Sequence, residues 1–93
     1  MSNIDIVLQQ IEGYIASINY DRLADTTFKL SLTQFLTDLQ TRYTFLSFSS
    51  KRTIRILKKY LGNTELTPSL WSHVANHLIK LKNSLKKERV LYG

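Results

Sequence analysis

The chain has 93 residues, of which 43% are hydrophobic and 22% are charged, and it carries a formal net charge of +6. This length allows one compact domain over residues 1–93, and the composition is too apolar for an intrinsically disordered chain. Because the chain has no cysteine, a disulfide framework, a thiolate zinc site and a thiol nucleophile are excluded, and a cytoplasmic location is expected.

The first predicted element is an amphipathic helix over about residues 3–19. Its apolar side chains recur at the spacing of a helix and form one stripe: Ile4, Val7, Leu8, Ile11, Ile15 and Ile18. Ser2 and Asp5 have the spacing of a capping box, which places the helix start directly after Ser2. The acids in this segment do not fit the basic start of a secretory signal, so no signal peptide is expected.

A second helix is predicted between Asp21 and Leu46. The apolar residues keep a helical period through this segment: Phe28, Leu32, Phe35, Leu36, Leu39, Tyr43 and Leu46. The stretch TTFKLSLTQ also alternates like a strand, and it contains a second capping box, Ser31 with Gln34. We expect a helix here, and a break near residues 26–31 stays open as an alternative.

The segment SFSS at residues 47–50 is predicted to be a linker, and Ser49 or Ser50 is expected to cap the third helix. In the following KRTIRILKKYLG, the apolar residues share one side of the helix: Ile54, Ile56, Leu57, Tyr60 and Leu61. The cations share the opposite side: Lys51, Arg52, Arg55, Lys58 and Lys59. Gly62 is expected to end this helix, because glycine is common directly after a helix C-terminus.

A fourth helix is predicted from Thr67 as the N-cap and Pro68 as the first helical residue to about residue 88. Its apolar face contains Leu70, Trp71, Val74, Leu78, Leu81 and Leu85. Four amphipathic segments with short connections pack most simply as an antiparallel bundle, because each apolar stripe needs neighbours on both sides. The sequence therefore predicts an all-α fold, a single antiparallel bundle of about four helices.

Charge is distributed unevenly along the chain. Residues 1–46 contain three cations and five acids, a net charge of −2, whereas residues 47–93 contain ten cations and two acids, a net charge of +8. A basic half of this kind attracts polyanions or an acidic membrane surface, and the alternative is that its charges only keep the surface hydrated. No membrane span is expected, since no apolar run reaches the ~20 residues that cross a bilayer.

The cations of the third helix are the strongest candidate for a functional surface. They occupy five of nine consecutive positions with no acid among them, although a solvated helix usually interleaves acids that relieve like-charge repulsion. Phosphate binding needs only cations and tolerates any base sequence, whereas hydration alone also explains the lysines of the fourth helix. We therefore expect a non-catalytic protein that contacts the backbone of RNA or DNA through Lys51, Arg52, Arg55, Lys58, Lys59, Lys80 and Lys87.

No motif in the sequence indicates a catalytic, cofactor or metal site. His73 and His77 lie four residues apart, a spacing at which two imidazoles can share a metal, but no cysteine, HExxH motif or nearby acid completes the site. The serines lack a GxSxG motif and the three glycines are isolated, so neither a hydrolase nor a phosphate-binding loop is indicated. Trp71 and Tyr60 are expected in the core. We expect no enzyme activity, cofactor, metal or small-molecule substrate.

Two families share features with this pattern. The stretches KRTIRILKK and LIKLKNSLKKER, on a small cysteine-free helical bundle, resemble the small subunits of CRISPR surveillance complexes. That resemblance implies a scaffold that lines guide RNA and displaced or target DNA beside other protein subunits. The length, the four-helix pattern and the C-terminal KKERVLYG are also similar to bacteriocin immunity proteins. The alternative function is therefore a protein-interaction module in the cytoplasm.

Overall fold

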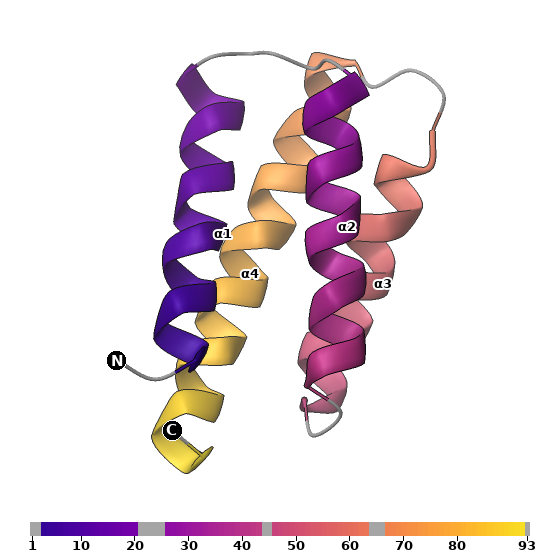
Figure 1. The fold of residues 1–93 in the computed structure, drawn as a ribbon. Helices are drawn as coiled ribbons and strands as arrows, with labels where there is room; N and C mark the ends of the chain where they lie inside the picture. Colours follow the sequence, from indigo (N-terminus) through magenta and orange to yellow (C-terminus); the bar gives the residue numbers. More distant parts are fainter. Residues whose placement is uncertain (1–2, 21–25, 44–45, 64–66, 93) are drawn as a thin grey trace.

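The computed structural model of the protein describes residues 3–20, 26–43, 46–63 and 67–92. These residues form α1 (Asn3–Tyr20), α2 (Thr26–Arg42), α3 (Phe48–Leu61) and α4 (Pro68–Tyr92), with no strand among them. The helices run alternately up and down (Figure 1), so the predicted all-α antiparallel bundle is confirmed. Of these helices, none combines the length and the apolar character that crossing a bilayer requires.

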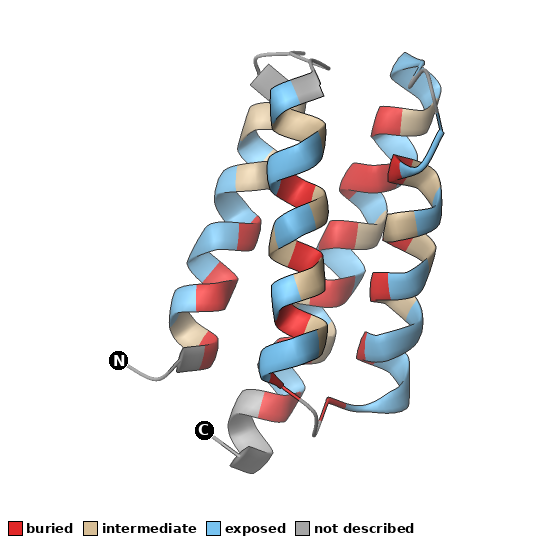
Figure 2. Ribbon diagram, turned by 45° about the vertical axis from the view of Figure 1, so that its right-hand side comes forward, coloured by how far each residue is buried: buried red, intermediate tan, exposed pale blue. Residues whose placement is uncertain are grey.

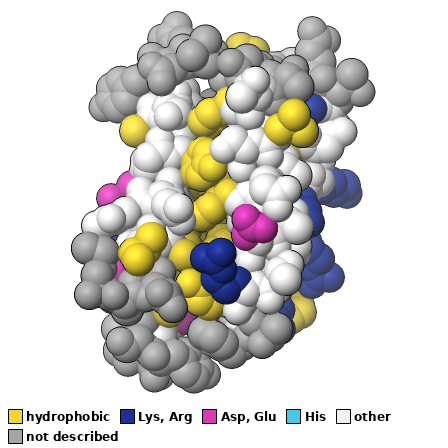
Figure 3. Space-filling view, in the orientation of Figure 1, with side chains coloured by type: hydrophobic (Ala, Val, Ile, Leu, Met, Phe, Trp, Pro, Cys, Tyr) yellow, Lys and Arg dark blue, Asp and Glu magenta, His cyan; other side chains and the backbone are white. Residues whose placement is uncertain are grey.

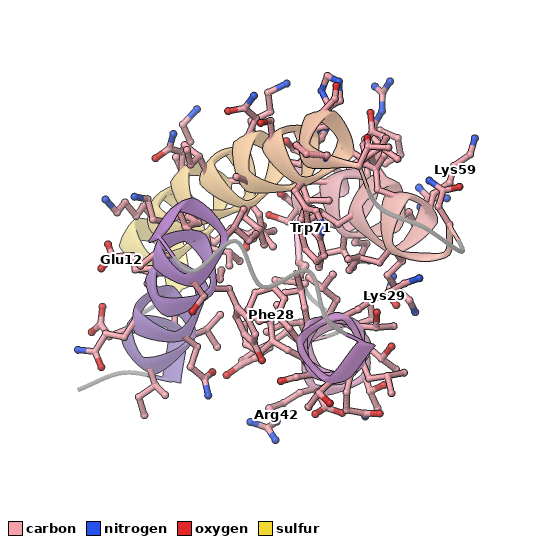
Figure 4. The ribbon with its side chains drawn as sticks, turned by 90° about the horizontal axis from the view of Figure 1, so that it is seen from above. Glu12, Phe28, Lys29, Arg42, Lys59 and Trp71 are labelled. Carbon is pink, nitrogen blue, oxygen red and sulfur yellow. The ribbon has the colours of Figure 1, made fainter. Side chains whose placement is uncertain are left out.

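The helices form an open ring in the order α1, α4, α3, α2 when seen from above (Figure 4). α4 packs closely against both α1 and α3, and α2 packs closely against α3. The backbones of α1 and α2 do not approach each other to a comparable extent. Apolar side chains are therefore visible in the seam between these two helices (Figure 3).

An aromatic cluster connects α1 with α2 across this seam. The Tyr14 ring lies 5.7 Å from the Phe28 ring and 5.2 Å from the Phe35 ring, and the Tyr14 hydroxyl lies 2.9 Å from Ser31 Oγ. The Phe28 ring in turn meets Trp71 of α4 edge to face at 5.6 Å, in the interior of the bundle (Figure 4). Aromatic side chains thus fill the space that the more distant backbones of α1 and α2 leave open.

The interior of the bundle is built from the apolar positions that the helical period selects. Residues fully shielded from water come from every helix: Ile11, Leu32, Leu36, Ile54, Leu57, Val74, Leu78 and Leu81. Buried positions face the interior along each helix (Figure 2). Trp71 belongs to this core and Tyr60 packs against it, as predicted. Each side chain of this size contributes about 1.5 to 3 kcal/mol when it leaves water, so these residues hold the helices together.

α3 begins at a buried hydrogen-bond network. Ser47 is its N-cap, with an extended backbone, and Ser47 Oγ accepts a hydrogen bond from the backbone N–H of Ser50 at 3.2 Å. Glu88 of α4 is buried, and its Oε1 accepts hydrogen bonds from the backbone N–H of Ser47 and from Ser50 Oγ. Ser50 Oγ also lies 2.7 Å from Ser84 Oγ. Because a carboxylate is favourable at a helix N-terminus, this network fixes the start of α3 against α4.

Two predicted boundaries in this region are wrong. α2 ends at Arg42 rather than Leu46, and the cap of α3 is Ser47 rather than Ser49 or Ser50. The cap needs a backbone in the extended region, with φ −63° and ψ 160° at Ser47, so α2 cannot continue into it. Leu46 is buried as predicted, but in the connection between the helices and not on α2.

The N-terminal half otherwise follows the prediction where it is described. α1 covers the predicted first helix, whereas Ser2, its expected cap, lies outside the described residues. α2 is helical without interruption from Thr26, so the strand-like alternation does not break it, and residues 21–25 lie outside the described range. Packing of Leu32 and Leu36 in the core overrides the local preference of that stretch.

Both predicted signals between α3 and α4 are confirmed. Gly62 directly follows α3 with φ −75° and ψ −10°, a right-handed conformation. Thr67 caps α4, since its Oγ1 accepts a hydrogen bond from the backbone N–H of Leu70 at 3.2 Å, and Pro68 is the first helical residue. α4 continues to Tyr92, beyond its predicted end.

Candidate nucleic-acid interface

The outer side of α3 presents exposed cations on a helix that contains no acid. The buried residues of α3, Ser50, Ile54, Leu57 and Leu61, hold the opposite side of the helix against the core. The helical period therefore directs four cations to the solvent, and we call them the α3 basic face: Lys51, Arg52, Arg55 and Lys59. Lys and Arg side chains line the edge of the molecule where α3 lies (Figure 3), and Figure 4 shows Lys59 projecting outward.

Lys58, the fifth cation predicted for this surface, lies beside α2. It is half-buried, and its Nζ donates a hydrogen bond to Oε1 of Gln40 in α2 at 3.0 Å. Lys29 of α2 also connects the two helices, since its Nζ donates a hydrogen bond to the backbone carbonyl oxygen of Asn63, just after α3. These two lysines join α2 to α3, so Lys58 is less available to a ligand than the α3 basic face.

Lys80 and Lys87, the expected contacts on the fourth helix, are exposed on α4, and α4 packs directly against α3. The seam between the two helices holds an aromatic stack. The Tyr60 ring of α3 lies parallel to His73 of α4, with centroids 5.9 Å apart and planes 9° apart, and 5.4 Å from the His77 ring. From the helical period, the α3 basic face and the α4 lysines flank this seam on either side.

The two histidines make contacts with neighbouring residues at the surface of the bundle. Nδ1 of His77 lies 2.8 Å from the backbone carbonyl oxygen of His73, to which it donates when it carries the ring proton. Both rings also contact Tyr60. Over the described ranges, no group of three histidine, cysteine, aspartate or glutamate side chains is placed to hold a metal ion.

Phe48 is a surface residue that the sequence prediction missed, and it is 72% exposed. Together with Arg52, Arg55, Ile56 and Lys59 it lines an open, shallow depression on the outer side of α3. The spacing of these residues, i, i+4, i+7, i+8 and i+11, places them on one side of a helix. That spacing could have placed Phe48 on the third helix, but the segment was interpreted as a linker because serines surround Phe48.

The described acids lie on other helices. Asp5 and Glu12 are on α1, Asp38 is on α2, and Glu88 is buried at the junction of α3 and α4. Glu12 Oε1 lies 3.9 Å from Lys82 Nζ, which pairs α1 with α4 at the surface. The charge of Lys82 is thus partly balanced, whereas the α3 basic face has no acid on its own helix.

The arrangement of these cations can bind an extended polyanion. From Phe48 to Lys59 the surface runs about 16 Å along the helix axis, at about 1.5 Å per residue. Comparison with protein-family models, with curated proteins and with solved structures found no match for this chain. The function proposed next therefore rests on the chemistry of this surface.

Proposed function

We propose that the protein is a non-catalytic helical subunit that binds nucleic acid and neutralises backbone phosphates with the α3 basic face. The observation that carries this proposal is the density of exposed cations, which fall within nine consecutive residues of a helix without an acid. Like charges three or four residues apart destabilise a helix by about 0.2 to 0.5 kcal/mol per pair, and a bound polyanion removes this repulsion. Lys80 and Lys87 extend the surface across the seam between α3 and α4.

Within this proposal the protein is one component of a nucleoprotein assembly in the cytoplasm, beside other protein subunits. The resemblance to the small subunits of CRISPR surveillance complexes supports this role, and guide RNA or target DNA would then meet the α3 basic face. Both nucleic acids fit the proposal, because phosphate contacts position a protein without reading the bases.

The salt dependence of binding tests this function. Affinity of the whole chain for labelled RNA and DNA is measured from about 50 mM to about 300 mM salt. Four to six phosphate contacts predict a slope of about 3 to 5 on a log–log plot, at about 0.7 to 0.9 per contact. A protein-interaction module similar to bacteriocin immunity proteins predicts no retention on nucleic acid even at the lowest salt.

Charge reversal locates the surface. Arg52→Glu with Lys59→Glu should remove most of the binding and leave the helical circular dichroism unchanged, because exposed substitutions alter stability by about 0.5 kcal/mol or less each. Arg42→Glu with Lys86→Glu is the matched control, since it makes the same change in net charge at exposed positions on α2 and α4. Binding that ignores salt, or equal losses in the two double variants, would contradict the proposal.

A further inference from the structure

The exposure of Phe48 has no explanation in the stability of the fold. Every other aromatic ring whose side chain is described packs in the core or against it, whereas Phe48 is 72% exposed. A phenylalanine that stays in water forgoes the ~1.5 to 3 kcal/mol that burial provides. A role in contacting a ligand accounts for its position.

The surroundings of Phe48 define the chemistry of that ligand. Arg52 follows one helical turn after the ring, and Arg55 and Lys59 continue the same side of α3. A matching ligand offers a flat apolar surface next to regularly spaced negative charges. Single-stranded nucleic acid has both, because its unpaired bases expose their π faces and each nucleotide carries a phosphate. A duplex keeps its bases stacked inside and offers this surface phosphates alone.

We infer that Phe48 is a base-stacking platform and that it makes the α3 basic face selective for single-stranded over double-stranded nucleic acid. This inference rests on the proposed binding of phosphates by α3. The network around Glu88 supports it, since it holds the backbone of Ser47 and so fixes the point at which the Phe48 ring leaves the bundle. The bound strand runs from Phe48 along α3 toward Lys59.

Substitution of Phe48 separates stacking from charge. Affinities of the whole chain are measured for a labelled single-stranded oligonucleotide and for the same oligonucleotide annealed to its complement. Phe48→Ala should weaken binding of the single strand about 5- to 150-fold, the range that corresponds to loss of one stacked base. Binding of the duplex and the salt slope should not change, because no phosphate contact is removed.

Two further variants and one control sharpen the test. Phe48→Leu should weaken single-strand binding to a similar extent, because leucine keeps apolar volume but has no π face, and Phe48→Trp should retain it. Leu30→Ala is the control, since Leu30 is 64% exposed on α2 and lies outside the depression at Phe48. Its binding should equal that of the unaltered chain.

The outcomes distinguish this inference from the proposed function. Salt-dependent binding that Phe48→Ala does not change, or equal affinity for single strand and duplex, would overturn the stacking role and leave phosphate binding in place. If Phe48→Leu binds the single strand as tightly as the unaltered chain does, and the chain also binds vesicles of anionic lipid, the surface would be assigned to a membrane instead. Absence of salt-dependent binding by the unaltered chain would remove the proposed function itself.

Discussion

Replacing Glu88 by alanine should lower the free energy of unfolding by about 2 to 4 kcal/mol. Glu88 is 3% exposed, and its Oε1 accepts hydrogen bonds from the N–H of Ser47 and from Ser50 Oγ. Hydrogen bonds to a charged group contribute about 1.5 to 3 kcal/mol each. The net loss is smaller than twice this value, because Ser50 keeps its contact with Ser84 and the cost of burying a charge disappears.

Thermal and urea unfolding followed by circular dichroism measure this change. At this chain length each kcal/mol shifts Tm by about 4 to 8 °C, so Glu88→Ala should melt at least about 8 °C lower. Glu88→Gln keeps an acceptor at Oε1, so its Tm should lie between those of the unaltered chain and of Glu88→Ala. Lys87→Ala, on the exposed side of α4, should change the free energy of unfolding by no more than about 0.5 kcal/mol. A loss below about 1 kcal/mol in Glu88→Ala, or an equal loss in Glu88→Gln, would refute the role of the carboxylate hydrogen bonds.

Substitutions in α1 and α4 test the stability of α1 and the charges of α4. Gly13→Ala should raise the free energy of unfolding by about 0.8 to 1 kcal/mol, because a Cβ there meets nothing within 4 Å and alanine favours the helix; a lower Tm would contradict this. Replacing Lys80 and Lys87 together by alanine should flatten the salt slope of nucleic-acid binding by about 1.4 to 1.8, whereas Lys82→Ala, which removes a lysine paired with Glu12, should leave the slope unchanged. Equal effects would mean that total charge, not position, determines binding.

Most of the fold could be predicted because its signals are local. Ile54, Leu57 and Leu61 recur at the period of a helix, and all three are buried. Thr67 and Gly62 mark helix ends because a cap interacts with backbone groups only a few residues away, so the residue types near a helix end indicate it. The same period predicted that the five cations of α3 would be exposed, and four of them are.

The start of α3 could not be predicted in this way, because a distant residue determines it. The cap Ser47 is held by Glu88, which lies 41 positions later in the chain, and no local pattern shows that contact. Phe48 was assigned to a linker because serines surround it, although it lies in the helix. Lys58 matched the cationic side by its period, but Gln40 of α2 accepts its hydrogen bond, and only the packing of α2 on α3 reveals this.

The position of α4 in the ring also determines the order in which the chain can fold during synthesis. α4 is the common packing partner of α1 and α3, and it follows the other helices along the chain. At about 5 to 20 residues per second on the ribosome, α1 emerges well before the helix that covers its apolar stripe. Among the helices made before α4, α2 and α3 pack most closely, and α1 meets α2 through the aromatic cluster around Tyr14. The rest of the apolar stripe of α1 therefore stays uncovered until α4 has been made.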